Sequence, residues 1–139
     1  MSSAIYTKKA SYYETDQMGI VHHSNYIRYF EDARVEFMSS IGCEVSELEK
    51  MGIIIPNVDA YARYKKPIRF RDEFSVEVKP ISFNGVKIVF EYEIRLTATN
   101  ELAATGRTTH CIVNEELKPM SIKHSFPEMY KKLKENLED

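Results

Sequence analysis

Cysteine is scarce in this sequence, and long apolar runs are absent. Only two of the 139 residues are cysteines, Cys43 and Cys111, and they form no Cys-x-x-Cys pair, so neither a disulfide framework nor a zinc knuckle is indicated. No apolar run approaches the roughly 20 residues of a membrane-spanning helix, and the N-terminus lacks the apolar core of a signal peptide. These absences predict a cytoplasmic protein, in a reducing compartment, with no membrane span.

An excess of charge of one sign is missing as well. The chain has 19 Lys and Arg against 21 Asp and Glu, which gives a formal net charge of −2, so no strong overall field attracts nucleic acid. Hydrophobic residues make up 43% of the sequence, an ordinary share for a globular protein. The length then predicts a single domain over residues 1–139, with a real core but little room for a separate lid.

The N-terminal part of the sequence predicts a strand, a loop and one long helix. Residues 4–13 are rich in Thr, Tyr and Ile without helical periodicity, so we expect a strand that runs into a polar loop. Over residues 26–41 apolar side chains recur every three or four positions, which predicts an amphipathic helix of about four to five turns. Ser24 or Asn25 is suited to cap its start, and Gly42 is suited to end it.

The remaining sequence predicts mainly strands. Apolar and polar residues alternate over 58–65, 74–83, 86–97 and 102–113. We expect these four strands to form an antiparallel meander, with Asn84-Gly85 in a type I′ hairpin turn and residues 44–52 as a connecting segment. The capping-box sequence Ser125–Glu128 predicts a short C-terminal helix. The expected fold class is α+β, with a curved antiparallel sheet of about five strands wrapped around the long helix.

The most unusual local sequence is Tyr12–Tyr26, which places a carboxylate, a glycine and two histidines before the helix. Asp16 precedes a helix start, where unpaired backbone N–H groups and the helix dipole favour negative charge. This combination suits acyl transfer, because N–H groups stabilise an oxyanion while the carboxylate acts as a general base on water or as a nucleophile. The alternative is structural: Asp16 makes an Asx turn, and Gly19 permits a tight bend.

Other chemistries have weaker support in the sequence. Adjacent side chains such as those of His22 and His23 usually diverge, and no His-Glu-x-x-His spacing occurs, so we expect no metal site. One of these histidines can instead orient a substrate. His110 and Cys111 read as a base and a nucleophile, but neighbours in a strand point to opposite faces. The Gly-x-Ser-x-Gly motif of serine hydrolases is absent.

Two groups of basic residues need an explanation. The segment Arg63–Arg71 interleaves basic and aromatic residues, a pattern suited to the phosphates of a nucleotide-bearing cofactor or to single-stranded nucleic acid. The alternative is a solvated strand end whose long side chains cover apolar surface. Arg34 falls beside the apolar stripe of the long helix, so a simple surface charge does not account for it.

The segment Tyr13–Tyr26, continued by Tyr29–Arg34, resembles the signature of the acyl-CoA thioesterases of the hotdog fold, in the family named for 4-hydroxybenzoyl-CoA thioesterase. The likeness is close over the first quarter of the chain, and Lys66–Asp72 and the later strands agree more loosely. It implies a curved antiparallel sheet around the long helix. It also implies a homodimer whose sheets join edge to edge, with a dimer of dimers as the larger alternative and the active site at the dimer interface.

The resemblance further implies roles for individual residues. Asp16 stands where the family has its catalytic carboxylate, and the backbone N–H of His23 would polarise the thioester carbonyl. Gly19 would permit the sharp turn, and Tyr26 would line the substrate site. Many relatives have a small residue where Met18 stands, so the acyl pocket is expected to differ there. The phosphates of CoA would be held by basic residues, for which the candidates are Lys65, Lys66, Arg69 and Arg107.

The expected function is hydrolysis of an acyl-CoA thioester to a free acid and CoA, without a metal or other cofactor and without nucleic acid. Two alternatives stay open. One is a thioesterase that acts on acyl carrier protein, whose acidic surface would dock on Arg63–Arg71. The other is a noncatalytic module that binds acyl-CoA in the same pocket.

Overall fold

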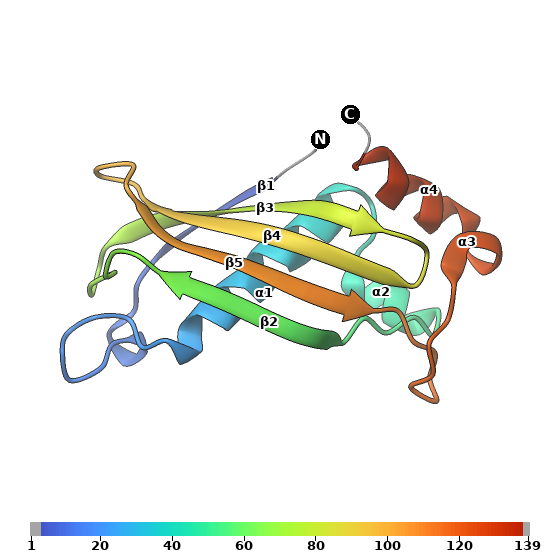
Figure 1. Cartoon of the computed structure of the whole chain (residues 1–139), viewed down its shortest axis with the longest axis horizontal. Helices are drawn as coiled ribbons and strands as arrows, with labels where there is room; N and C mark the ends of the chain where they lie inside the picture. The colour runs from blue at the N-terminus through green and yellow to red at the C-terminus, as the bar shows by residue number, and fades with distance from the viewer. Residues whose placement is uncertain (1–3, 138–139) are drawn as a thin grey trace.

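One five-stranded antiparallel sheet and one long helix make up most of the molecule. The computed structural model describes residues 4–137 and places helix α1 (Ser24–Ser40) across one face of the sheet (Figure 1). The strands are β1 (Ala4–Lys9), β2 (Asn57–Tyr64), β3 (Glu73–Phe83), β4 (Lys87–Leu96) and β5 (Leu102–Cys111). The predicted α+β class is confirmed, with five strands and a single long helix.

The strand order corrects the predicted four-strand meander. The order across the sheet is β1-β3-β4-β5-β2, so β2 pairs with β5 and not with β3, and only β3, β4 and β5 form a meander. The connection after β2 cannot close a tight hairpin, because Pro67 interrupts the strand and the carbonyl of Ile68 accepts the N–H of Val21 at 2.7 Å. Strands β1 and β2 therefore form the two edges of the sheet.

Helix α1 supplies one half of the core. Its buried side chains include Tyr29, Phe30, Ala33 and Phe37, at the spacing of three and four that the sequence shows. They face the apolar side chains of β3 and β4, which alternate between buried and partly exposed along both strands. The predicted helix is confirmed, and a single apolar stripe attaches it to the sheet.

The N-terminal end of α1 differs from the prediction, and its C-terminal end agrees with it. The helix starts at Ser24 with His23 as its N-cap, and no side chain caps it, so the expected cap by Ser24 or Asn25 is wrong. The amide of Asn25 instead donates to the carbonyl of Glu14 at 2.9 Å. At the other end Gly42 has φ +81°, as predicted for a left-handed residue after a helix.

The structure differs from the prediction in three short segments: the end of the first strand, the connection after α1 and the turn at Asn84-Gly85. Strand β1 ends at Lys9, and a 3₁₀ turn η1 (Tyr12–Glu14) follows, so the expected strand over 4–13 is too long. The connection over 44–52 contains a short helix, α2 (Val45–Lys50). The chain reverses at Asn84-Gly85, but only Gly85 has positive φ, so the turn is not type I′. The Asn84 side chain shapes this turn by accepting the N–H groups of Val86 and Lys87.

The C-terminal part forms two short helices, α3 (Ile122–Ser125) and α4 (Pro127–Glu135). The predicted capping box is wrong, because Ser125 ends α3 and its hydroxyl donates to the carbonyl of Ser121 at 2.9 Å. Pro127 opens α4, where its missing N–H costs nothing. Within residues 4–137 no helix has the length and the apolar character that crossing a membrane requires.

Candidate active site

Asp16 lies in a tight turn between η1 and α1. Its N–H donates to the carbonyl of Ile20 at 2.9 Å, and its Oδ1 accepts the N–H of Met18 at 2.8 Å. Gly19 completes the turn with φ +77°, a conformation that glycine adopts without strain. The Asx turn therefore forms, and it uses one carboxylate oxygen. The Oδ2 atom has no hydrogen-bond partner within the described chain.

The turn is attached to the rest of the fold through Glu14, a residue that the sequence did not single out. Its side chain is 8% exposed, and its Oε1 accepts the N–H of Ser11 at 2.8 Å. Its carbonyl accepts the N–H of His22 at 2.8 Å and the amide of Asn25 at 2.9 Å. Burial, followed by the neighbouring Glu14 carboxylate, raises the pKa of Tyr29. Glu14 thus holds the loop against the first turn of α1.

His23 places an unused N–H group at the start of α1. The N–H of His22 donates to Glu14, and that of Ser24 donates to Nδ1 of His22 at 3.2 Å, but the N–H of His23 has no acceptor among residues 4–137. The side chain of His23 is exposed, and its ring lies 4.0 Å from that of His22. A free N–H at the positive end of a helix dipole is a site for developing negative charge.

Asp16 and His23 line the same open cavity of about 410 Å³. Tyr26, Lys65 and Lys66 line it too, so five of the predicted site residues come together from two distant segments of the chain. Sequence reasoning missed Tyr64, which also lines the cavity with its ring 4.8 Å from that of Tyr26. Burial, with a smaller effect of Tyr64, raises the pKa of Tyr26 to about 12, so its phenol stays protonated at neutral pH.

Gly19 and Arg69, which the sequence also predicted to contact the substrate, are not part of the cavity lining. Gly19 lies between Met18 and Ile20, which do line the cavity. The exposed Arg69 pairs through its backbone with Ile20. Lys66 forms an ion pair with Glu101 at 3.2 Å.

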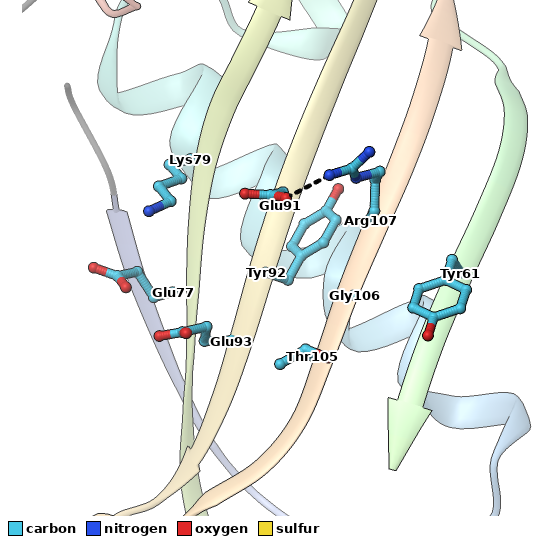
Figure 2. A pocket seen from close by; sticks show the side chains of 9 residues that line it. All are labelled: Tyr61, Glu77, Lys79, Glu91, Tyr92, Glu93, Thr105, Gly106 and Arg107. Carbon is cyan, nitrogen blue, oxygen red and sulfur yellow. Dashed lines mark hydrogen bonds and ion pairs between the residues drawn. The ribbon is translucent and has the colours of Figure 1, made fainter. Parts of the chain in front are cut away.

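Arg107 lies elsewhere, on the sheet face that points away from α1 (Figure 2). It lines a separate cavity of about 420 Å³ and donates to Glu91 at 2.7 Å. Alternate residues of β5 point to opposite faces, so Arg107 turns outward while Thr108 turns inward. Within one chain, Arg107 therefore does not join the other predicted phosphate contacts.

His110 and Cys111 also separate as their strand positions predict. His110 is fully buried, and its Nε2 lies 2.8 Å from the hydroxyl of Thr108, whereas Cys111 is half-buried and points its sulfur toward its neighbour's carbonyl. The described residues contain no group of three or more His, Cys, Asp or Glu placed to hold a metal ion.

Comparison with known proteins decides the family. A model of the thioesterase-like superfamily matches residues 11–137. The chain belongs to this superfamily. A DHNA-CoA thioesterase from Staphylococcus aureus has a structure similar to this thioesterase, with 32% identity and a TM-score of 0.93 over 97% of this chain and 91% of the other.

Two relatives extend the likeness to named acyl-CoA enzymes. YneP of Bacillus subtilis, provisionally named an acyl-CoA thioesterase, is 36% identical over 86% of this chain and 86% of its own. The acyl-CoA thioester hydrolase YbgC of Escherichia coli is 26% identical over 86% of this chain and 90% of its own.

The hotdog fold expected from the resemblance is thereby confirmed, and the enzyme is a thioester hydrolase. In this thioesterase the polar groups suited to the chemistry come from the loop before α1 and from the segment that follows β2.

Proposed function

We propose that this thioesterase hydrolyses acyl-CoA thioesters to a free carboxylic acid and CoA. The observation that carries the proposal is the shared cavity of Asp16, with one carboxylate oxygen unpaired, and His23, with its N–H unpaired. Relatives named for acyl-CoA substrates, YneP and YbgC, support the choice of thioester.

Each group has a defined role in the proposed reaction. Asp16 Oδ2 accepts a proton from water as the water oxygen bonds to the thioester carbon, and the His23 N–H stabilises the oxyanion that forms. The C–S bond then breaks, and the CoA sulfur takes the proton from Asp16 as the acid is released. In a nucleophilic route the same oxygen of Asp16 bonds to the carbonyl carbon as the C–S bond breaks, which gives an acyl anhydride and the CoA thiolate. Water then hydrolyses the anhydride to the free acid and the Asp16 carboxylate, and the proton released goes to the thiolate.

Positive charge beside the cavity suits the CoA part of the substrate. Lys65 and Lys66 line the cavity, and Arg69 pairs through its backbone with Ile20, which also lines it. The cationic groups of these residues supply contacts for phosphate oxygens. The proposed hydrolysis uses the Asp16 carboxylate, the N–H of His23 and water, and it needs no metal or redox cofactor.

The proposed active unit is a homodimer joined through β2. This strand is at the edge of the sheet, and seven of its eight residues are exposed, among them Val58 and Tyr61 at 60% and 57%. An exposed edge strand offers unpaired backbone groups to another strand. Antiparallel pairing of two β2 strands about a two-fold axis satisfies both copies with one surface, and it continues the sheet from one protomer into the other.

Release of free thiol from a panel of acyl-CoA substrates tests the proposal. We expect turnover by the wild type and a loss of about 100- to 10,000-fold in kcat for Asp16→Asn, since removing a general base costs that range. Asp32→Asn, an exposed carboxylate on α1, is the matched control and should retain activity. Equal rates for folded wild type and Asp16→Asn would contradict the role of Asp16.

The same panel separates the two alternatives. A thioesterase specific for acyl carrier protein would have a higher kcat/KM on the acylated carrier than on the matching acyl-CoA. A noncatalytic module would bind acyl-CoA saturably and release no thiol.

A further inference from the structure

His22 lies one residue before the N-cap of α1 and adjoins His23, whose N–H is the proposed oxyanion donor. The side chain of His22 is half-buried, and it is not part of the lining of the Asp16 cavity, whereas His23 is. The rings of the two histidines lie 4.0 Å apart and are tilted by 34°. His22 is therefore next to the proposed site but outside the cavity, and the steps of the proposed hydrolysis do not use it.

The imidazole of His22 contacts Ser24 through one atom, Nδ1. The backbone N–H of Ser24 donates to this nitrogen at 3.2 Å, and Oγ of Ser24 lies 2.8 Å from it. A ring nitrogen that accepts an N–H carries no hydrogen of its own, so the neutral ring has its hydrogen on Nε2. The hydroxyl of Ser24 then donates to Nδ1 as well.

The other backbone N–H groups around the start of α1 are used within the backbone. Those of Asn25 and Tyr26 donate to the carbonyls three positions earlier, at 3.0 and 3.2 Å, and that of His22 donates to the loop before the helix at 2.8 Å. Within the part of the chain that the structure describes, the N–H of Ser24 has the imidazole of His22 as its acceptor. With this contact made, His23 carries the N–H that is left for a substrate.

Loss of the imidazole would leave unpaired N–H groups on two adjacent residues. An unsatisfied donor at a helix start destabilises the first turn, so the backbone around His23 would lose a restraint and its N–H would lose its fixed direction. The freed N–H of Ser24 would not replace it, because Ser24 does not line the cavity of Asp16. Displacement of a reacting group by about 1 Å is enough to lower a rate by about 100-fold.

We propose that His22 is a positioning residue for thioester hydrolysis: its neutral imidazole holds the N–H of Ser24 and thereby fixes the N–H of His23 as the oxyanion donor. This inference rests on the proposed function. Because Nδ1 acts only as a hydrogen-bond acceptor, His22 transfers no proton in the reaction. The reaction then requires an acceptor at the position of Nδ1 and does not require an imidazole.

The test replaces His22 with side chains that remove or keep this acceptor and measures thiol release from an acyl-CoA that the wild type hydrolyses. His22→Leu removes the acceptor, and we expect kcat to fall by about 10- to 100-fold. KM should change little, because His22 does not line the cavity. His22→Asn places an amide oxygen near the position of Nδ1, so it should recover most of the lost kcat.

Two results of this comparison would overturn the proposal. The first is an equal kcat for wild type and folded His22→Leu. The second is a loss in folded His22→Asn as large as that in His22→Leu, since it would show that the imidazole itself takes part in the reaction.

Two further variants control for the hydroxyl of Ser24 and for the replacement of a histidine. Ser24→Ala removes the hydroxyl and keeps the N–H, so it should lower kcat much less than His22→Leu does. Equal losses would assign the effect to the hydroxyl and contradict the role of the N–H. His124→Leu, at an exposed histidine on α3, should leave kcat unchanged, and a comparable loss there would count against a specific role of His22.

NMR without substrate tests the contact itself. In the isotope-labelled wild type, the neutral ring of His22 should carry its hydrogen on Nε2, and hydrogen exchange of the Ser24 amide should be faster in His22→Leu than in His22→Asn. A hydrogen on Nδ1, or equal exchange in the two variants, would overturn the proposal whether or not thioesters are hydrolysed. A wild type that shows the expected NMR results but hydrolyses no acyl-CoA would instead refute the proposed function.

Discussion

Phe30 lies against the backbone of Gly106 so closely that no side chain fits between them. A Cβ on Gly106 would stand 2.2 Å from Cζ and 2.3 Å from Cε2 of the Phe30 ring. The φ angle of Gly106 is not in the left-handed region, so the close approach of α1 to β5 requires this glycine and the backbone conformation does not. The same Phe30 ring stacks on Tyr92 at 4.4 Å.

Gly106→Ala should therefore destabilise the protein by about 1–3 kcal/mol, the usual cost of an overpacked core. Urea denaturation measures the change, and Thr105→Ala, on the opposite sheet face, should change stability less. Adding Phe30→Leu to Gly106→Ala should recover part of the loss, because the smaller side chain leaves room for the new methyl group. Strictly additive losses in the double variant would contradict the steric explanation.

Gly19→Ala should cost about 1–2 kcal/mol in stability, because an L-residue at φ +77° is strained. Among residues 4–137, no atom beyond Gly19 and its two chain neighbours lies within 4 Å of the added Cβ, so the cost comes from the backbone alone. Gly19→Asn should cost less, since asparagine tolerates the left-handed region. Comparing the two variants by thermal denaturation checks the cause, and an equal cost would point to a lost contact instead.

Two substitutions of His23 separate the catalytic role of its backbone N–H from that of its side chain. If the N–H is the oxyanion donor, His23→Ala should keep most of the activity, whereas His23→Pro should lower kcat by about 100- to 1,000-fold. His23 has φ −55°, which proline accommodates at a helix start. Circular dichroism is the check that both variants fold. A collapse of kcat in His23→Ala would transfer the role to the imidazole.

Stability should fall as the pH drops from 7 toward 5 because of His110. Burial, followed by the charge of Arg34, lowers its pKa from 6.5 to about 4. Between these values the unfolded chain binds the proton and the folded chain does not, so protonation favours unfolding by up to about 1.4 kcal/mol per pH unit. His110→Gln should flatten this slope in urea titrations. The exposed His124→Gln is the control, and equal slopes for both variants would exclude His110 as the cause.

Ala60→Asp should break the β2 dimer. Ala60 lies near the middle of β2 and is exposed, so a two-fold axis through the strand would bring two carboxylates close together, where like charges destabilise strand pairing. Light scattering should show a monomer, and the thiol-release assay should show reduced thioesterase activity. Ile5→Asp, on the exposed outer edge strand β1, should remain dimeric. A dimeric Ala60→Asp would place the interface elsewhere.

The sequence by itself determined the elements whose signals are local. The three-and-four spacing over 26–41 produces α1 because one helix face must be buried, and the alternation over 74–96 produces β3 and β4 because one sheet face must be buried. The turn of Asp16 and Gly19 is equally local, since its hydrogen bonds join residues at most four positions apart. The thioesterase resemblance depended on this segment.

Only the tertiary structure decided what depends on distant residues. The pairing of β2 with β5, the requirement for glycine at 106 and the outward position of Arg107 all follow from packing between segments that no local pattern relates. Arg34 shows the same limit: its place beside the apolar stripe was visible in the sequence. Its partner Tyr92 is 58 positions away, and such a contact exists only because α1 lies across the sheet.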